Sequence, residues 1–260
     1  MLKIPENYTE LLLWIKETTE EYWGENALTT CDGYDCIDWI GAKWIGLTDN
    51  QIDEIEHKYS VKFMPEHREF LRILHAVDRK EKYKDDDGEI ISSSYFYNWL
   101  EDETKINKML NWTFETILSD VNGRYWLKSW GERPKSEEDR KIIFSNWFDK
   151  TPKLIPITGH TFLVSDIALQ DRPLLSVWGS DTVVTGWNLR NYLLSQFCGY
   201  LDFYTEIDEN VDTHVDDIED YIPEYATFRR REFELSKTKT IPYFAELIVQ
   251  TGNSLAHPIL

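Results

Sequence analysis

The sequence predicts an α+β fold in which a small β-sheet packs against helices. The main evidence is a region between residues 152 and 197, where short runs of β-branched, leucine and aromatic residues alternate with turn-forming residues. Helical periodicity precedes this region, and within it the last strand leads into a further helix that Asn188 caps. Phe162 and Val164 alternate with polar residues, which predicts that one face of their strand meets solvent. The predicted strands are Leu154–Ile157, Thr161–Ser165, Leu174–Trp178 and Thr182–Thr185.

Three helices are predicted in the first 75 residues of the chain. The first covers residues 7–23, with Asn7 as its cap and apolar residues along one face. The second begins after Thr48, because Thr48 and Gln51 have the spacing of a capping box. Pro65 begins the third helix, since the fixed φ of proline suits the first helical position.

The middle of the chain gives weaker signals. Residues 78–89 are charged and predict turns, whereas the aromatic stretch over residues 90–99 predicts a strand. A short helix is expected over residues 104–110. Ser136, with Asp139 three positions later, is the N-cap of a helix that continues through Trp147.

The segment from Asp202 to Glu224 holds ten acidic residues and no lysine or arginine. An apolar stripe repeats within it at helical spacing, which predicts an amphipathic helix in an acidic C-terminal extension over residues 201–260. The acidic face has three available roles, which are to bind a cationic partner, to pair with Arg229–Arg231 or to face water. A last helix is predicted over residues 241–250. The stripe consists of Ile207, Val211, Val215 and Ile218.

Composition and charge restrict the class of protein and its partners. The chain has 260 residues, of which 42% are hydrophobic and 14% aromatic, and neither a repeat nor a flexible linker divides it, so we expect one domain over residues 1–260. The 28 basic and 47 acidic residues give a net charge of −19, which disfavours binding to nucleic acids and to anionic membranes. The same charge attracts a basic protein, although acidity also serves solubility alone.

Several observations favour a cytoplasmic protein. The residues after Met1 lack the pattern of a secretion signal, and no apolar run approaches the roughly 20 residues that span a bilayer. Cys31, Cys36 and Cys198 contain no Cys-x-x-Cys pair, which is consistent with reduced thiols.

The order of these segments resembles the SUKH superfamily, whose members include a fungal regulator of cell-wall glucan synthesis and many bacterial immunity proteins. The resemblance covers roughly residues 40–200 and implies a central mixed, largely antiparallel sheet with helices packed on one side. The residues that carry it are Trp44-Ile45-Gly46-Leu47-Thr48, Ile52-Asp53-Glu54-Ile55-Glu56, Phe63-Met64-Pro65-Glu66, Phe70-Leu71, Trp126 to Pro134, Pro152 to Ile157, Gly159-His160, and Pro173 to Val177 followed by Ser180-Asp181. The chain departs from the bacterial branch at Thr161, where arginine is expected, and in its long acidic region.

No common catalytic motif is present, so we expect a protein that is not an enzyme and needs no cofactor or metal. The acidic Asp85–Glu89 stretch fails as a calcium loop, because Tyr83 and Ser94 would occupy positions that require carboxylates or close substitutes. His160 follows a turn glycine at the start of a strand, where it lines a cleft or serves as a hydrogen-bonded structural residue.

The sequence therefore predicts a protein-binding domain, most directly an immunity protein that neutralises a basic toxin such as a nuclease. A regulatory scaffold for cell-wall synthesis or signalling is the alternative. A carbohydrate-binding protein is a third reading, in which Trp126 and Trp130 share one helix face as a sugar platform, while core packing is the competing account of that pair. The candidate partner-binding residues are Asp212, Asp216, Asp217, Glu219, Asp220, Trp126 and Trp130.

Overall fold

The computed structural model describes residues 3–25, 39–84, 90–203, 221–238 and 241–250. The chain divides into two compact units, which we call the N-terminal unit and the sheet unit. The described residues of the N-terminal unit are 3–25, 39–84, 90–103, 193–203 and 221–226, and those of the sheet unit are 104–192, 227–238 and 241–250. None of the described helices is both long and apolar enough to cross a membrane.

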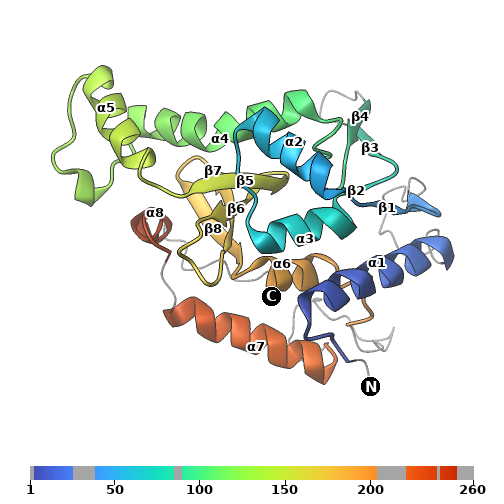
Figure 1. Ribbon diagram of the computed structural model, residues 1–260. Helices are drawn as coiled ribbons and strands as arrows, with labels where there is room; N and C mark the ends of the chain where they lie inside the picture. The colour runs from blue at the N-terminus through green and yellow to red at the C-terminus, as the bar shows by residue number, and fades with distance from the viewer. Residues whose placement is uncertain (1–2, 26–38, 85–89, 204–220, 239–240, 251–260) are drawn as a thin grey trace. The chain divides into compact units, whose positions relative to one another are not determined.

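The fold is α+β, with helices and antiparallel strands, as predicted (Figure 1). The elements of the first hundred residues are α1 (Tyr8–Glu25), β1 (Trp44–Ile45), α2 (Asp49–Tyr59), α3 (Pro65–Leu74), β2 (Ala76–Val77), β3 (Glu81–Lys84) and β4 (Ile90–Ser93). They are followed by α4 (Glu103–Asn122), the short 3-10 helix η2 (Lys128–Trp130), α5 (Glu137–Phe148), β5 (Lys153–Thr158), β6 (Thr161–Ser165), β7 (Leu174–Trp178) and β8 (Asp181–Gly186). The last helices are α6 (Leu189–Gln196), α7 (Pro223–Thr238) and α8 (Ala245–Gln250).

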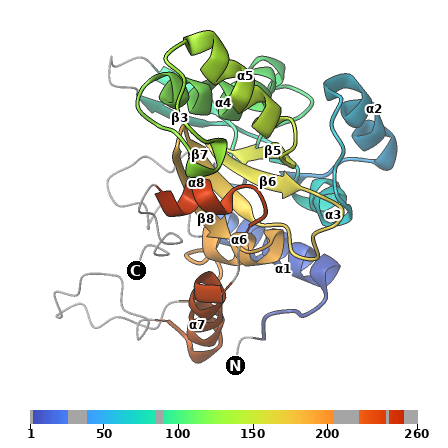
Figure 2. The same cartoon turned by 90° about the vertical axis from the view of Figure 1, so that its left-hand side faces the viewer.

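The sheet unit is built on four strands in the order β5-β6-β7-β8, and each strand pairs antiparallel with the next. All four predicted strands are confirmed, with bounds that differ by at most one residue. Two views place α4 and α5 on the same side of this sheet (Figure 1, Figure 2). The expectation of a solvent-facing side for Thr161–Ser165 is wrong, because Leu163 is buried together with Phe162 and Val164. Side chains that point to both faces of β6 therefore belong to the core.

The N-terminal unit contains a tightly connected pair of helices, α2 and α3. Thr48 caps α2, and the side chain of Gln51 accepts a hydrogen bond from the Thr48 backbone, so the predicted capping box is present. Pro65 occupies the first turn of α3, as predicted. Before α2, the chain passes so close to the end of α3 that a Cβ atom at Gly46 would overlap the carbonyl oxygen of Arg72.

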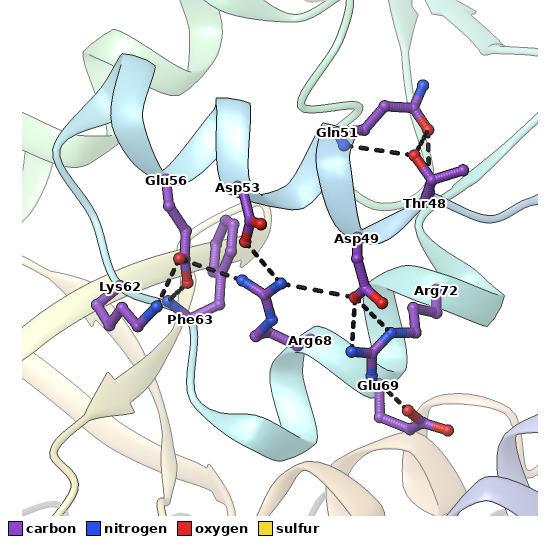
Figure 3. A network of polar contacts seen from close by, with 10 residues as sticks. All are labelled: Thr48, Asp49, Gln51, Asp53, Glu56, Lys62, Phe63, Arg68, Glu69 and Arg72. Atoms are coloured by element: carbon purple, nitrogen blue, oxygen red, sulfur yellow. Dashed lines mark hydrogen bonds and ion pairs between the residues drawn. The ribbon is translucent and has the colours of Figure 1, made fainter.

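A network of ion pairs joins the facing sides of α2 and α3 (Figure 3). Arg68 lies 2.8 Å from an oxygen of Asp53 and 3.1 Å from an oxygen of Glu56. Arg72 lies 2.6 Å from Asp49 and 2.7 Å from Glu69. Both guanidinium groups are thus balanced by carboxylates of the same helix pair, which indicates a structural role.

Three predictions in other regions are corrected. Residues 81–84 form β3 and not a turn, because they pair with β4. Strand β4 ends at Ser93 and is therefore shorter than the strand predicted over residues 90–99. Helix α4 begins at Glu103 and continues to Asn122, well beyond the predicted end at residue 110. Its buried stripe extends through Thr113, Ile117 and Val121, so burial sustains the helix over its whole length.

Candidate functional site

The most exposed tryptophan among the described residues is Trp178, at the end of β7. Trp178 is 58% exposed. Because tryptophan has a large apolar surface, this exposure leaves a large apolar area in contact with solvent. Large exposed aromatic side chains are enriched where proteins bind other molecules, whereas scattered small apolar residues on a surface need no special explanation. We therefore take Trp178 as the centre of a candidate binding site.

Two further aromatic rings lie against Trp178, and a cation lies over one of them. The ring of His160 lies 4.2 Å from the Trp178 ring between centroids, at an angle of 78°. The Trp112 ring lies 5.1 Å from Trp178 and 5.0 Å from His160. On the helix that carries Trp112, the ammonium group of Lys108 lies 5.5 Å from the Trp112 ring centre. We call Lys108, Trp112, His160 and Trp178 the Trp178 cluster; all four belong to the sheet unit.

The backbone beside Trp178 is fixed to α4 at two points. The indole nitrogen of Trp112 donates a hydrogen bond of 3.0 Å to the carbonyl oxygen of Val177. On the other side, a carboxylate oxygen of Asp120 accepts a hydrogen bond of 2.6 Å from the backbone N–H of Ser180. These two bonds hold the backbone before and after Trp178, so Trp178 is presented on a rigid support.

Gly179 is required for this close approach of the turn to α4. Its φ of +62° lies in the left-handed region, which residues with a Cβ atom rarely adopt. A Cβ atom at this position would also overlap the Asp120 carboxylate. Gly179 thus permits the hydrogen bond that anchors the turn.

His160 contributes an uncharged ring to the cluster at neutral pH. Partial burial lowers the pKa of His160 below its ordinary value, and the nearby positive charge of Lys108 acts in the same direction. A neutral imidazole offers one donor and one acceptor nitrogen and packs against indole rings without the cost of burying a charge. The site accordingly combines aromatic surface with a limited number of polar groups.

Trp126 and Trp130 lie elsewhere in the sheet unit, in a second aromatic group. Their rings meet edge to face at 78°, with 5.0 Å between centroids, and only Trp130 belongs to a helix, the three-residue η2. The indole nitrogen of Trp126 donates to the Gly131 carbonyl oxygen, and the Trp130 ring contacts Trp147. Two rings at this angle do not form the flat platform on which a sugar stacks. The role of Trp126 and Trp130 in binding a partner stays a prediction.

The acidic candidates Asp212, Asp216, Asp217, Glu219 and Asp220 lie outside the described residues, as do Asp85–Glu89. The predicted amphipathic helix around Val211 and Val215 lies there too. Within the described parts of the chain, no group of three or more histidine, cysteine, aspartate or glutamate side chains is placed to hold a metal ion.

Sequence reasoning identified His160 as a candidate but missed Trp178, Trp112 and Lys108. The available signal was the turn-forming run Gly179-Ser180-Asp181, which places Trp178 at the last position of the strand before it. The four-residue spacing of Lys108 and Trp112 would have paired them on one helix face, but the predicted helix ended at residue 110.

Comparisons of the chain with models of protein families, with curated proteins and with solved structures found no match. The SUKH resemblance therefore stays a prediction.

Proposed function

We propose that the chain is a SUKH-like protein of the bacterial cytoplasm that acts without catalysis, as an immunity protein that binds and neutralises a cognate toxin. The observation that carries this proposal is the Trp178 cluster, an exposed aromatic surface on a rigid support. Binding energy in protein interfaces is concentrated in a few such residues, among which tryptophan is strongly enriched. The order of the sequence segments that resemble the SUKH superfamily supports the more specific assignment, because many members of that superfamily are immunity proteins.

The proposed mechanism separates the approach of the toxin from its retention. The net charge of −19 attracts a basic toxin and raises the rate of encounter. The Trp178 cluster then supplies the contacts that determine how slowly the complex dissociates. Because the turn that carries Trp178 is already held by Trp112 and Asp120, little ordering is needed at the moment of binding.

The test is capture of the partner followed by an assay of its toxicity. The purified chain is used as bait in a lysate of the native cells at low and at high salt. We expect one basic protein that is retained at low salt, that stops growth when it is expressed alone and that is harmless when it is expressed together with this chain. Capture of housekeeping envelope or signalling proteins, with no growth inhibitor among them, would contradict the proposal and favour the scaffold alternative.

A matched pair of variants connects this test to the candidate site. Trp178→Ala removes the exposed indole, whereas Ile142→Ala removes an apolar side chain of similar exposure, 50%, from α5. Protection from the toxin should be lost with Trp178→Ala and kept with Ile142→Ala. Equal protection by both variants would exclude the Trp178 cluster as the toxin-binding surface.

A further inference from the structure

We infer that the exposed indole of Trp178 stacks against an arginine or lysine side chain of the partner, an inference that rests on the proposed function for the partner being a protein. Tryptophan is the aromatic residue that attracts cations most strongly, because the face of its ring carries negative electrostatic potential. At 58% exposure, Trp178 has surface left for a ligand after its contacts with His160 and Trp112.

The cluster already holds one cation of its own. The Lys108 ammonium lies 5.5 Å from the centre of the Trp112 ring, within the distance at which a cation is attracted by an indole face. Lys108 and Trp112 are both on α4 and four residues apart, so this contact is internal to the helix. It shows that a ring of this cluster accepts an ammonium group, while the neighbouring Trp178 ring is the more exposed one.

The charges around Trp178 are compatible with a cationic ligand. Asp181 is the direct cross-strand neighbour of Trp178, so both side chains lie on the same face of the sheet. The carboxylate of Asp120 accepts the hydrogen bond from the N–H of Ser180, which lies two residues after Trp178 along the chain, and adds a second negative charge there. Lys108 opposes these two charges, and His160 is neutral near pH 7, because partial burial and Lys108 lower its pKa. The charges of Asp181, Asp120 and Lys108 thus sum to −1, of the same sign as the net charge of the whole chain.

The test uses a charged probe and an uncharged probe of the same shape. N-acetyl-arginine methylamide and its citrulline counterpart are each titrated into the ¹⁵N-labelled full chain, and the indole N–H signals are followed by NMR. The signal of Trp178 is assigned as the one that disappears in Trp178→Phe. We expect this signal to move saturably, with affinity for the arginine probe about two- to fivefold higher than for the citrulline probe. Equal affinity for both probes, or no movement of the Trp178 signal, would overturn the inference.

Two variants distinguish the aromatic face from apolar surface in general. Trp178→Leu keeps a large apolar side chain but has no aromatic ring, and the backbone signal of Ser180 reports on the same site. We expect the arginine probe to shift Ser180 in the parent chain and in Ile142→Ala, and to lose this effect in Trp178→Leu. An unchanged effect in Trp178→Leu would show that the probe binds through apolar contact or charge alone.

The outcome is independent of the test for a toxin. A captured toxin together with equal binding of the two probes would remove the cation inference and leave the immunity proposal intact. Selective binding of the arginine probe without any captured toxin would contradict the immunity proposal while supporting a cation-binding surface.

Discussion

Two histidines, His67 in α3 and His75 at the C-cap of that helix, are buried in an uncharged form. Both ring nitrogens of His67 and the Nδ1 atom of His75 have no hydrogen-bond partner in the described part of the chain. The Nε2 atom of His75 accepts a hydrogen bond of 2.9 Å from the backbone N–H of Trp99, a role that only an unprotonated nitrogen can fill. Burial lowers the pKa of His67 to about 3, with a smaller contribution from His75, and lowers the pKa of His75 to about 4, although Asp102 acts in the opposite direction.

These two residues predict a loss of stability in mild acid. The ordinary histidine pKa is 6.5, so below this pH the unfolded chain binds protons that the folded chain excludes. The free energy of unfolding should therefore fall as the pH falls from about 6.5 towards 4, by about 1.4 kcal/mol per pH unit for each histidine once the unfolded state is protonated. Urea denaturation followed by tryptophan fluorescence at pH 7.5, 6 and 5 measures this dependence.

Substitution of His67 isolates its share of the effect. His67→Leu should make the fall in stability with pH shallower, because the variant lacks the ring whose protonation the folded chain excludes. A His67→Leu variant with the slope of the parent chain would show that other groups, such as the 47 carboxylates, account for the acid sensitivity.

The α2–α3 pair is the element whose geometry depends most on a single residue. Because a Cβ atom at Gly46 would overlap the Arg72 carbonyl oxygen, Gly46→Ala must push the backbone before α2 away from α3. Leu47 N–H donates to the Leu71 carbonyl oxygen at 2.9 Å, so this bond would be strained as well. We expect a loss of about 1–3 kcal/mol or more in the free energy of unfolding, measured with urea.

Gly24 in α1 provides the control for that prediction. A Cβ atom there would meet no other atom within 4 Å. Gly24→Ala should be neutral, or stabilise the chain by up to about 1 kcal/mol through helix propensity. If both alanine variants had the same stability, the close approach at Gly46 would not be a constraint on the fold.

The contact between the β7–β8 turn and α4 also depends on a single residue, Asp120. Asp120→Ala removes the acceptor of the Ser180 N–H, whereas Asp120→Asn retains an oxygen that can accept. Hydrogen exchange at the Ser180 amide should become about tenfold faster or more in Asp120→Ala and change less in Asp120→Asn. Unchanged exchange in Asp120→Ala would mean that α4 does not hold the turn that presents Trp178.

At the scale of elements, the sequence predicted what local chemistry determines. The caps at Thr48, Ser136 and Asn188 each depend on residues within three positions, and all of them are present. Strand β3 was missed, because its pairing with β4 overrides the turn preference of its charged residues. The Trp178 cluster was missed for a related reason: residues from α4, β7 and the turn before β6 meet only after the sheet and helix have packed.

For the whole molecule, the excess of acidic residues is the property expected to govern how fast a basic partner binds. Changing Asp216, Asp217, Glu219 and Asp220 to their amides removes four negative charges from the acidic segment. Association with the captured toxin should slow, and its dependence on salt should weaken, because long-range attraction controls the encounter. The association rate is measured by stopped flow at salt concentrations from about 50 to about 300 mM, a range in which the screening of charges increases.

A second set of four charges serves as the control. Glu10, Glu17, Glu21 and Glu54 are exposed on α1 and α2, and their change to glutamine gives the same net charge. If the two fourfold variants slow association equally, net charge alone steers the toxin; if neither does, the steering mechanism is excluded.

The central claim is that Trp178 anchors a protein partner, and its most direct test is the affinity of Trp178→Ala for the captured toxin. The equilibrium dissociation constant is measured by calorimetry for the parent chain, for Trp178→Ala and for Ile142→Ala, after confirming that all three unfold at the same urea concentration. We predict that Trp178→Ala binds about 30-fold more weakly or worse, a loss of at least about 2 kcal/mol, while Ile142→Ala binds like the parent. Parent-like affinity in Trp178→Ala would contradict the account.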